Sequence, residues 1–499
     1  MDYAVAVLDI GKTNKKVAVY DDRMNPIDVR KCTIETVRKG DLDVEDVDAA
    51  MSWFLAELKD LAQIHPIRVI SITTHGASVV CVDESGDICI PPIAYTNEVP
   101  DSVHESFWKA VGPAGDIQRR TATAEVKPLI NVGKLLWYQK STNPEAFDRI
   151  AHVLFYPQYF GYRLTGRAAA DITYTGCHSY LWDFGESDWS SVVDVLGIRD
   201  ALPAKPGVPE AELGTLSSEA VRATGLPGET KVTLGIHDSN SSLIPYLITQ
   251  DRDFVLNSTG TWCVAMHPVD RVRFEDDEVG KMVFFNLSFQ GRPVKTSILM
   301  GGQEYAVYVD AIMGHHDRRD WPDYDPGMYD AILSKKASFI LPTMLPGTGQ
   351  FPDSEARVVD GDAVYSVDDI VSGRRWPKAF EDYLGGFALA NLSLAIQTRV
   401  ALQRVGLEPG TEVFIEGGFR QNPNYGALLG ALLPENPLYL TALEEATSFG
   451  AALIGKALMD DVPVASLKEY VRLDKQPVEP ARLEGLEDYV AEFLRHVDS

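Results

Sequence analysis

Three features are scarce in this sequence of 499 residues: long apolar runs, paired cysteines and positive charge. No segment reaches the roughly 18 uninterrupted apolar residues that a membrane-spanning helix needs, so we expect no membrane partner. The five cysteines show no Cys-x-x-Cys spacing, which argues against a disulfide framework and against a zinc site. The formal net charge of −26 disfavours nucleic-acid partners, because they require a basic footprint on the protein.

The first residues, Met1 to Ala4, lead directly into an apolar segment, so we expect no signal peptide. Together with the cysteine usage, this predicts a cytoplasmic protein. A phosphate ligand is compatible with the acidic composition, because a few local Lys and Arg side chains and Mg²⁺ can supply the positive charge that it needs.

The length predicts at least two domains, because single hydrophobic cores stop growing at roughly 250–300 residues. Residues 201–230 are rich in Pro and Gly, which is typical of an ordered connector. We place the domain boundary just behind this connector, between Ser242 and Asp251, which divides the chain into domains of residues 1–244 and 245–499.

Two strand–turn–strand patterns predict two halves of similar design. The first spans residues 4–20 and turns at Gly11-Lys12-Thr13-Asn14, and the second spans 254–266 and turns at Ser258-Thr259-Gly260-Thr261. We expect the two turns to face one another across a cleft that Gly, Thr, Asp and Lys line. Such a cleft suits phosphate chemistry.

The segments between these hairpins alternate between helical and strand periodicity. Val47–Ile64 carries apolar residues at helical spacing, and Ile67–Thr73 is a short apolar strand that ends at Thr74-His75-Gly76-Ala77. Val79–Val82 and Ile88–Ile93 predict a further hairpin. The alternation predicts an α/β fold in which ligands bind at the carboxyl ends of the strands.

The second half repeats this pattern. Glu412–Glu416 is a largely apolar strand that is followed by Gly417-Gly418. Three helices are predicted at Glu381–Val405, Ser448–Leu458 and Leu483–Phe493.

Asp238 follows a predicted strand, Val232–Ile236, and lies between His237 and Ser239. A carboxylate in this position can be the general base that accepts the proton of a substrate hydroxyl. In phosphoryl transfer such a base mainly orients the attacking oxygen, while positioning and metal electrostatics supply most of the catalysis. The alternative is that Asp238 caps the helix that starts at Ser239, and one residue can do both.

The turn Gly11-Lys12-Thr13-Asn14 offers backbone N–H groups, a hydroxyl and a cation to a phosphate. Asp9, at the end of the preceding strand, can hold Mg²⁺ through water. The turn is not a P-loop, because it connects two strands and lacks the P-loop spacing. An ordinary hairpin turn is the alternative.

Two further turns carry candidate nucleotide contacts. The hydroxyls and amides of Ser258-Thr259-Gly260-Thr261 suit a β- or γ-phosphate, and Gly417-Gly418 lets a flat ring approach the backbone, with Asn422 as a hydrogen-bonding partner. A plain hairpin turn and a strand-to-helix turn with positive φ are the respective alternatives.

His75 and His237 each end a predicted strand, which makes ligand contact as good an interpretation as a core histidine. His315 and His316 lie in a polar, irregular segment, 313–330, which is typical of an insertion or a lid. They have no neighbours with metal-ligand spacing, so we interpret them as solvated loop residues.

The order of these motifs resembles that of the FGGY carbohydrate kinases, of the actin/hexokinase/Hsp70 fold superfamily, over roughly residues 3–460. Each motif is weak alone, and the set is specific. The set consists of Asp9-Ile10-Gly11-Lys12-Thr13-Asn14, Thr74-His75-Gly76, Leu213-Gly214-Thr215-Leu216, Gly225-Leu226-Pro227, Leu234-Gly235-Ile236-His237-Asp238, Ser258-Thr259-Gly260-Thr261, Gly417-Gly418 with Asn422, and Phe449-Gly450-Ala451-Ala452. The resemblance implies an α/β fold of two ribonuclease-H-like domains, each a mixed β-sheet flanked by helices, with the cleft between them.

The resemblance also implies ATP and Mg²⁺ as cofactors and assigns roles to residues. Asp238 would be the base on the sugar hydroxyl, and Asp9 would help to hold Mg²⁺. The cofactor contacts would be Gly11, Lys12, Thr13, Asn14 and Lys16 at the transferred phosphoryl group, Thr259, Gly260 and Thr261 at the nucleotide phosphates, Gly301 and Gly302 at the ribose, and Gly418 and Asn422 at the adenine. The sugar contacts would be Thr74, His75, Gly76, Tyr95, Asn97, His237 and Asp238.

Within the family, His237-Asp238-Ser239 and Ser258-Thr259-Gly260-Thr261-Trp262 look most like the L-rhamnulose and L-fuculose kinases. His75-Gly76-Ala77 is instead similar to the xylulokinases, and the lack of an Arg-Glu pair beside that turn disfavours glycerol. Lys12 and Asn14 depart from the small residue and the Ser or Thr that are usual in the family's first turn, and both can still contact phosphate.

We therefore expect an ATP-dependent sugar kinase that phosphorylates the terminal hydroxyl of a ketose such as L-rhamnulose, L-fuculose or a ketopentose. Xylulose, ribulose and erythritol remain open as substrates, and so does a homodimer. The rivals are a non-catalytic sensor of the same fold and a kinase that forms acyl phosphates. Asp9, Asp238 and two phosphate turns argue against the sensor, and the acyl-phosphate reaction needs a basic cleft residue where His75-Gly76 stands.

Overall fold

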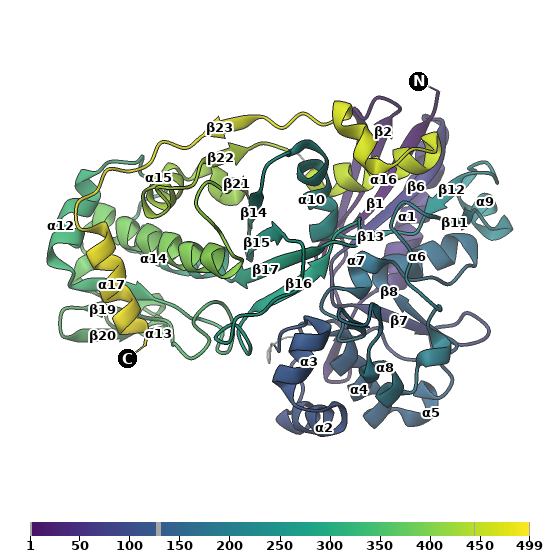
Figure 1. Cartoon of the computed structure of the whole chain (residues 1–499), viewed down its shortest axis with the longest axis horizontal. Coiled ribbons are helices and arrows are strands. Elements are labelled where there is room, and N and C mark those ends of the chain that lie inside the picture. The colour runs from purple at the N-terminus through teal and green to yellow at the C-terminus, as the bar shows by residue number, and fades with distance from the viewer. Residues whose placement is uncertain (1, 126–130, 444, 499) are drawn as a thin grey trace.

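The computed structural model describes residues 2–125, 131–443 and 445–498, and its elements gather around two β-sheets (Figure 1). Up to residue 249 these elements are β1 (Ala4–Ile10), β2 (Asn14–Asp21), β3 (Pro26–Thr33), β4 (Val37–Lys39), β5 (Leu42–Val44), α1 (Val47–Leu61), β6 (Ile67–Thr74), β7 (Val79–Val82), α2 (Asp101–Val111), α3 (Ala114–Thr121), α4 (Val132–Thr142), α5 (Pro144–Phe147), β8 (His152–Phe155), α6 (Tyr156–Thr165), α7 (Ile172–Thr175), β9 (Trp182–Asp183), β10 (Asp188–Trp189), α8 (Ser191–Leu196), η1 (Arg199–Ala201), β11 (Glu212–Thr215), α9 (Ser218–Thr224), β12 (Lys231–Thr233), β13 (Ile236–His237) and α10 (Asp238–Thr249).

From residue 254 onward the elements are β14 (Phe254–Thr259), β15 (Cys263–Pro268), β16 (Val283–Leu287), β17 (Pro293–Leu299), α11 (Gly301–His315), α12 (Gly327–Lys335), β18 (Ser338–Leu341), β19 (Arg357–Asp360), β20 (Ala363–Ser366), α13 (Val367–Val371), η2 (Lys378–Phe380), α14 (Tyr383–Arg404), β21 (Glu412–Gly417), η3 (Gly418–Gln421), α15 (Pro423–Leu432), β22 (Leu438–Thr441), α16 (Ala446–Asp460), η4 (Val464–Tyr470), β23 (Lys475–Pro477) and α17 (Leu486–Val497).

The two seven-stranded sheets share one plan. The first has the order β11-β12-β6-β1-β2-β3, with β13 also paired to β6, and the second has the order β16-β17-β15-β14-β21-β22-β23. In each sheet the opening hairpin is antiparallel, β1 with β2 and β14 with β15, and its first strand pairs in parallel with a later strand, β6 or β21. The predicted α/β fold of two similar halves with mixed sheets is confirmed.

Helices cover both faces of the first sheet. α1 places Met51, Phe54 and Leu58 in the core on one face, at the helical spacing that the sequence shows. The other face packs against α10 and α16. β1 therefore lies between two helical layers, and all seven of its residues are buried.

The helix α10 lies between the two sheets. Ile244 packs in the core on the first sheet, whereas Tyr246 packs with strands of the second. α16 crosses α10 at close range, since a Cβ at Gly450 would lie 1.9 Å from the carbonyl oxygen of Ser241. A single helix thus contacts both sheets, and its first residue is Asp238.

The chain crosses between the halves again near its end. Residues 446–470, which form α16 and η4, pack on the first sheet and on α10, and Figure 1 shows α16 beside β1 and β2. β23 then pairs with β22 of the second sheet, and α17 packs against β18. The proposed division after residue 244 falls inside α10, and residues 446–470, which that division assigns to the second domain, pack on the first sheet.

Two predicted strands differ from the structure. Of the hairpin predicted from Val79–Val82 and Ile88–Ile93, the turn and one antiparallel bridge, Val82 with Ile88, are present. Its second strand is not, and β7 pairs instead with β8. The strand predicted at Val232–Ile236 is two strands, β12 and β13. Gly235 separates them because it adopts a φ of +91°, a conformation that glycine tolerates.

The predicted helices of the second half are present with small shifts at their ends; the one predicted at Glu381–Val405 is α14. The segment predicted as irregular, 313–330, is helical at both ends, since α11 continues to His315 and α12 begins at Gly327. None of the helices within the described ranges combines the length and the apolar character needed to cross a membrane.

Candidate functional site

Asp238 lies where the topology brings the two halves together. β13 runs parallel to the end of β6, so that His237 pairs with Thr74, and the chain then enters α10. His237 occupies the N-cap position and Asp238 the first position of the helix, so the interpretation of Asp238 as the cap is wrong. The Asp238 carboxylate instead accepts a hydrogen bond from the N–H of Ser239 at 2.6 Å.

The surroundings of Asp238 make its carboxylate a stronger base. Burial raises the pKa of Asp238 to about 6, with a further rise from the Asp9 carboxylate, while His75 and the hydrogen bonds from Ser239 oppose the change. The side chain nevertheless keeps 31% of its surface exposed. A carboxyl with this pKa is ionised at neutral pH and is basic enough to accept a hydroxyl proton.

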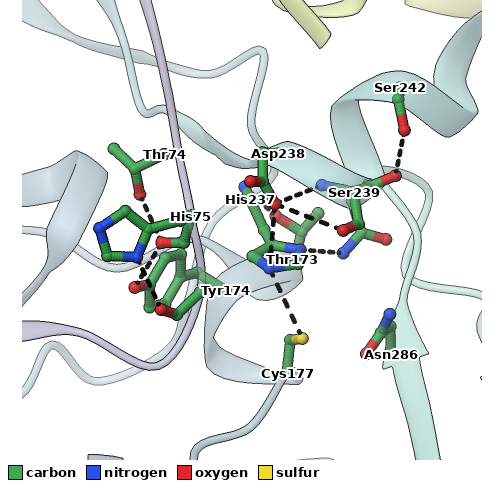
Figure 2. Close-up of polar contacts among 12 residues, drawn as sticks. Thr74, His75, Thr173, Tyr174, Cys177, His237, Asp238, Ser239, Ser242 and Asn286 are labelled. Atoms are coloured by element: carbon green, nitrogen blue, oxygen red, sulfur yellow. Dashed lines mark hydrogen bonds and ion pairs between the residues drawn. The ribbon is translucent and has the colours of Figure 1, made fainter. Parts of the chain in front are cut away.

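His237 lies beside the Asp238 carboxylate (Figure 2). Burial lowers the pKa of His237 to about 4, so the ring is neutral at pH 7. Asn240 Nδ2 donates to His237 Nδ1 at 3.2 Å, which leaves the ring proton on Nε2, 3.3 Å from Asp238 Oδ1. A Cβ at Gly76 would lie 2.7 Å from the same Nε2, so glycine is needed beside this pair.

Two cavities meet at Asp238. The histidine cavity, of about 280 Å³, is lined by His75, Tyr95, His178 and His237 from the first half and by residues on β15, β16 and β17 from the second. The lysine cavity, of about 370 Å³, is lined by Lys16, Ser242, Ser258, Glu416, Arg420 and Glu445 among others. Asp238 and Ser239 line both cavities, so one carboxylate faces two separate spaces.

The first turn brings charge to the lysine cavity. Lys16 Nζ lies 3.1 Å from Asp9 Oδ2 and also contacts the Glu445 carboxylate. Burial opposes the charge of Lys16, but the two carboxylates outweigh it and raise the pKa of Lys16. Ser448 Oγ donates to the same oxygen of Asp9 at 2.5 Å, while Thr13-Asn14 is exposed at the tip of the turn. The structure thus brings the predicted residues Asp9 and Lys16 together beside Asp238.

Glu45, which the sequence did not predict, connects the first turn to the histidine cavity. Its carboxylate contacts Lys12, and its Oε1 lies 4.0 Å from Nε2 of His75. Lys12 Nζ also lies 5.4 Å from the centre of the Tyr95 ring. Burial lowers the pKa of His75, and its Nε2 has no hydrogen-bond partner among the described residues. The predicted residues Lys12, His75 and Tyr95 therefore form one cluster with an open hydrogen-bonding position.

Lys15 fixes the shape of the first turn from inside. Its side chain is buried, and its Nζ donates to the carbonyl oxygens of Gly11 at 3.1 Å, Lys12 at 2.8 Å and Ile34 at 3.0 Å. Burial lowers the pKa of Lys15. The sequence carries no signal for this role, because Lys15 is one of several lysines beside a polar turn.

The second turn has no charged residue. Gly260 and Thr261 are exposed at its tip, whereas Thr259 is buried. Thr259 Oγ1 donates to the carbonyl oxygen of Glu416 at 2.5 Å and accepts from the N–H of Phe419 at 3.0 Å. Two hydrogen bonds within the protein thus occupy the hydroxyl that the sequence assigns to a nucleotide phosphate, and the exposed tip residues are the ones open to a ligand.

Glycines pack the second turn against its neighbours. A Cβ at Gly302 would lie 2.0 Å from the carbonyl oxygen of Gly260, and a Cβ at Gly417 would lie 2.0 Å from that of Thr259. Gly417 also adopts a φ of +87°, so a side chain there would meet both a steric clash and an unfavourable backbone conformation. A Cβ at Gly418 would meet only the Thr259 oxygen, at 3.9 Å, which leaves this backbone open to a ligand.

Asn422 and Gly301 pack inside the second half. Asn422 Nδ2 donates to Asn391 Oδ1 at 2.8 Å, and the side-chain oxygen of Asn422 caps α15. A Cβ at Gly301 would lie 2.9 Å from the sulfur of Cys263. Their roles toward adenine and ribose stay predictions; in the structure they hold the backbone around the two glycine turns.

Two predicted sugar contacts are not among the residues that line the histidine cavity. Thr74 is buried, and its Oγ1 donates to the carbonyl oxygen of His75 at 3.0 Å. The Asn97 amide donates to the carbonyl oxygens of Asp43 at 2.8 Å and of Ala94 at 2.7 Å, and it accepts from the N–H of Asp43 at 2.8 Å. Both side chains therefore position loops next to the cavity.

The second half supplies a wall of the histidine cavity that the sequence did not predict. Phe284 and Asn286 of β16 and Ile298 of β17 lie on it. The Phe284 ring packs on His178, with ring centres 4.5 Å apart, and burial lowers the pKa of His178 to about 3. A lone amide in an otherwise apolar strand, Val283–Leu287, is the signal that points to Asn286.

Glu416 and Arg420 are further unpredicted residues of the lysine cavity. Burial raises the pKa of Glu416 to about 7, although Tyr246 donates to its Oε2 at 2.9 Å and Arg420 lies nearby. A carboxyl that is partly protonated at neutral pH repels a phosphate less than a fully ionised one does.

The residues at the cleft fit ATP and Mg²⁺. Within the described part of the chain, no three His, Cys, Asp or Glu side chains gather as a set of metal ligands. Mg²⁺ does not need such a set, because it binds through one or two carboxylates together with phosphate oxygens and water. Asp9 supplies a carboxylate there, Lys16 and Arg420 supply cations for phosphate, and Gly418 leaves room for a flat ring.

The chain matches two models of one family. The model for the N-terminal domain of the FGGY family of carbohydrate kinases covers residues 4–245, and the model for the C-terminal domain of FGGY carbohydrate kinases covers residues 251–462. An L-fuculokinase of Salmonella typhi is 27% identical over 281 residues, which are 52% of this chain and 56% of that protein. A rhamnulokinase of Enterococcus faecalis is 26% identical over 240 residues, 46% of this chain and 47% of that protein. The matches thus span about half the length of these relatives.

Solved structures resemble the whole chain. A carbohydrate kinase from Novosphingobium aromaticivorans has a TM-score of 0.78 and 25% identity, and the match covers 100% of this chain and 99% of the other. A ligand-bound xylulose kinase from Lactobacillus acidophilus shares the fold, with a TM-score of 0.78, 15% identity and coverage of 99% and 96%. From these matches and the two-sheet topology, we conclude that the chain belongs to the FGGY family of carbohydrate kinases.

Proposed function

We propose that the chain is an ATP-dependent sugar kinase that transfers the γ-phosphoryl group of ATP to the terminal hydroxyl of a ketose such as L-rhamnulose, L-fuculose or a ketopentose. The observation that carries the proposal is the position of Asp238, which lines both the histidine cavity and the lysine cavity. The family supports the reaction class, and relatives named L-fuculokinase and rhamnulokinase support a ketose as the acceptor.

On the sugar side, His75, Tyr95 and His237 offer hydrogen bonds to hydroxyl groups in the histidine cavity. Asp238 accepts the proton of the reacting hydroxyl and orients its oxygen toward the lysine cavity. The pKa of Asp238 is raised to about 6, which makes the carboxylate more basic than an ordinary aspartate. Since pH 7 still lies above this pKa, the carboxylate is mostly ionised there. His237, neutral and fixed by Asn240, holds that carboxylate in place.

On the phosphate side, Lys16 and the backbone of the first turn bind the transferred phosphoryl group, and the exposed Gly260-Thr261 tip contacts the neighbouring phosphates. Mg²⁺ held by Asp9 would neutralise phosphate charge. Lys15 keeps the first turn rigid, so that its N–H groups need little reorganisation when a phosphate binds.

Closure of the two halves over both ligands would exclude water and limit wasteful hydrolysis of ATP. As part of the proposal we place the reaction in the cytoplasm, where the five free cysteine thiols are stable.

A coupled assay of ADP release with a panel of ketoses and polyols, read as kcat/KM, tests the proposal. We expect at least one ketose to reach about 10⁴ M⁻¹s⁻¹ or more, the lower end of the range for enzymes, and glycerol to stay far below it. The rival is a non-catalytic sensor of the same fold. Tight binding of a sugar without ADP release from any acceptor in the panel would favour that rival.

A further inference from the structure

The histidine cavity has two unlike walls. The wall from the first half carries His75, His237 and Asp238, and the proposed reaction takes place along it. The wall from the second half carries the apolar side chains of Val264, Met282, Phe284 and Ile298, together with the polar side chains of Asn286 and Thr296 and the indole of Trp262. The proposed reaction assigns no role to this second wall.

Asn286 is a buried amide with an unused acceptor. Its side chain is 2% exposed, and its Nδ2 lies 3.4 Å from Thr296 Oγ1. Its Oδ1 has no hydrogen-bond partner among the described residues. Native proteins leave few buried acceptors unpaired, because each one costs free energy. Figure 2 shows Asn286 on its strand, opposite Cys177 and Asp238 of the first half.

The first wall carries a matching feature. Nε2 of His75 is also buried and without a hydrogen-bond partner among the described residues. Asn131 Oδ1 of the first half also lines this cavity without a hydrogen-bond partner among the described residues. The two halves thus bring His75 Nε2 and Asn286 Oδ1 to one cavity. A ligand with hydroxyl groups at two separated carbons can satisfy both atoms. The second wall also presents the apolar side chains of Met282 and Phe284 to the cavity.

We propose that this second wall selects the substrate: Asn286 Oδ1 accepts a hydrogen bond from one sugar hydroxyl, while Met282 and Phe284 pack against a sugar carbon that carries no hydroxyl. The substrate class is then a ketose with a terminal methyl group, a 6-deoxy-ketohexose. The inference rests on the proposed function for the phosphorylated end of the sugar and adds the recognition of the opposite end.

Two pairs of ketoses that differ only at C6 test the apolar part of the wall. They are L-rhamnulose with L-fructose and L-fuculose with L-tagatose. An added hydroxyl against an apolar wall loses its hydrogen bonds to water, so we expect kcat/KM to be about 10- to 100-fold higher for the deoxy member of the preferred pair. Equal or higher kcat/KM for the hydroxylated member overturns the inference.

Substitutions at Asn286 test the polar part. Asn286→Leu keeps the volume and removes the amide, and we expect the KM of the preferred ketose to rise about 10-fold while the KM of ATP stays the same. Asn286→Asp keeps an acceptor oxygen and should retain more of the sugar affinity. An unchanged sugar KM in Asn286→Leu overturns the role of this residue.

Ser297→Ala is the matched control. Ser297 lies on the neighbouring strand β17, its hydroxyl is buried and unpaired among the described residues, and it does not line the cavity. We expect no change in either KM. If Asn286→Leu fails to fold, Asn286→Asp tests the polar part through the sugar KM, and the comparison of sugar pairs with the unaltered protein still tests the apolar part.

Titration calorimetry of the same sugar pairs separates the two possible failures. Preferential binding of the deoxy sugar without phosphorylation would support selection by the second wall and contradict the proposed kinase activity. Phosphorylation without a preference for the deoxy sugar, together with an unchanged sugar KM in Asn286→Leu, would support the proposed kinase activity and contradict selection by the second wall.

Discussion

The opening hairpins of the two halves occupy equivalent places in their sheets but contribute different chemistry. The first turn is charged, with Lys12 and Lys16 beside Asp9, and a buried lysine holds its backbone. The second turn has no charged residue, and Gly302 and Gly417 pack so closely on its backbone that a Cβ at either would lie 2.0 Å from a carbonyl oxygen. In the proposed phosphate site, one half would therefore supply charge and the other a closely packed backbone.

The histidine cavity shows the same division. The first half contributes histidines and a carboxylate, and the second half contributes a largely apolar wall in which Asn286 Oδ1 has no partner among the residues that the structure describes. Because α10 lies between the sheets and begins at Asp238, the carboxylate stands where these two unlike surfaces meet. The expected effects of mutation follow from which side of this boundary a residue occupies.

Removing the shared residue should have the largest effect. Asp238→Asn keeps the shape of the side chain and removes the base, so we expect kcat to fall by about 10²- to 10⁴-fold. Affinity for ATP and the midpoint of thermal unfolding should change little, because the carboxylate does not cap α10. Steady-state kinetics and calorimetry measure these quantities, and a loss in kcat of less than tenfold would contradict the base assignment.

The close fit of the second turn can be broken at one position. Gly417→Ala places a Cβ 2.0 Å from a backbone oxygen at a φ of +87°, and we expect it to lower the free energy of unfolding by about 2–4 kcal/mol. The neighbouring Gly418→Ala is the matched control, because its Cβ would lie 3.9 Å from the nearest atom. Denaturant unfolding compares the two, and equal losses would show that the fit at Gly417 is looser than the geometry implies.

The rigidity of the first turn depends on a buried cation. Lys15→Met keeps the apolar stem and leaves the carbonyl oxygens of Gly11, Lys12 and Ile34 without their donor. We expect a loss of about 1–3 kcal/mol in the free energy of unfolding and a higher KM for ATP. Lys109→Met, at an exposed lysine in the last turn of α2, is the control for charge alone. A variant with unchanged stability and ATP kinetics would show that Lys15 does not hold the turn.

The polar wall of the histidine cavity should give the smallest and most specific effect. His75→Leu removes an Nε2 that has no hydrogen-bond partner in the described part of the chain, on a residue that lines the cavity. We expect the KM of the sugar to rise about 10-fold, the equivalent of one hydrogen bond. The KM of ATP should stay within a factor of two or three. A rise in the KM of ATP alone would contradict the assignment of His75 to the sugar side of Asp238.

Sequence predicts those site residues whose signal is local. Asp9, His75 and Asp238 each follow or end a strand and stand beside a small-residue turn, so their positions can be located from the amino-acid sequence alone. The two equivalent hairpins are visible for the same reason. The break at Gly235 escapes prediction, because the apolar run around it looks like a single strand.

The residues that escape prediction depend on contacts between distant segments. Glu45 follows β5, and its carboxylate contacts Lys12 of the first turn. Asn286 lies on β16 and lines the same cavity as residues of the first half. Asn97 is the opposite case, because the sequence predicts a sugar contact that the structure does not show. Its amide instead forms hydrogen bonds with the backbone of Asp43, 54 positions earlier. Burial and pairing at this range have no signature in a single sequence.

The pH dependence of kcat/KM for the preferred ketose, at saturating MgATP, tests the central claim most directly. Asp238 must be ionised to accept a proton and has its pKa raised to about 6 by burial, so kcat/KM should fall about tenfold per pH unit below pH 6 and level off above it. Glu416→Gln, which removes the carboxyl whose burial raises its pKa to about 7, should leave this limb in place. A profile that stays flat from pH 8 down to pH 5 would contradict the claim that the Asp238 carboxylate takes the proton of the sugar.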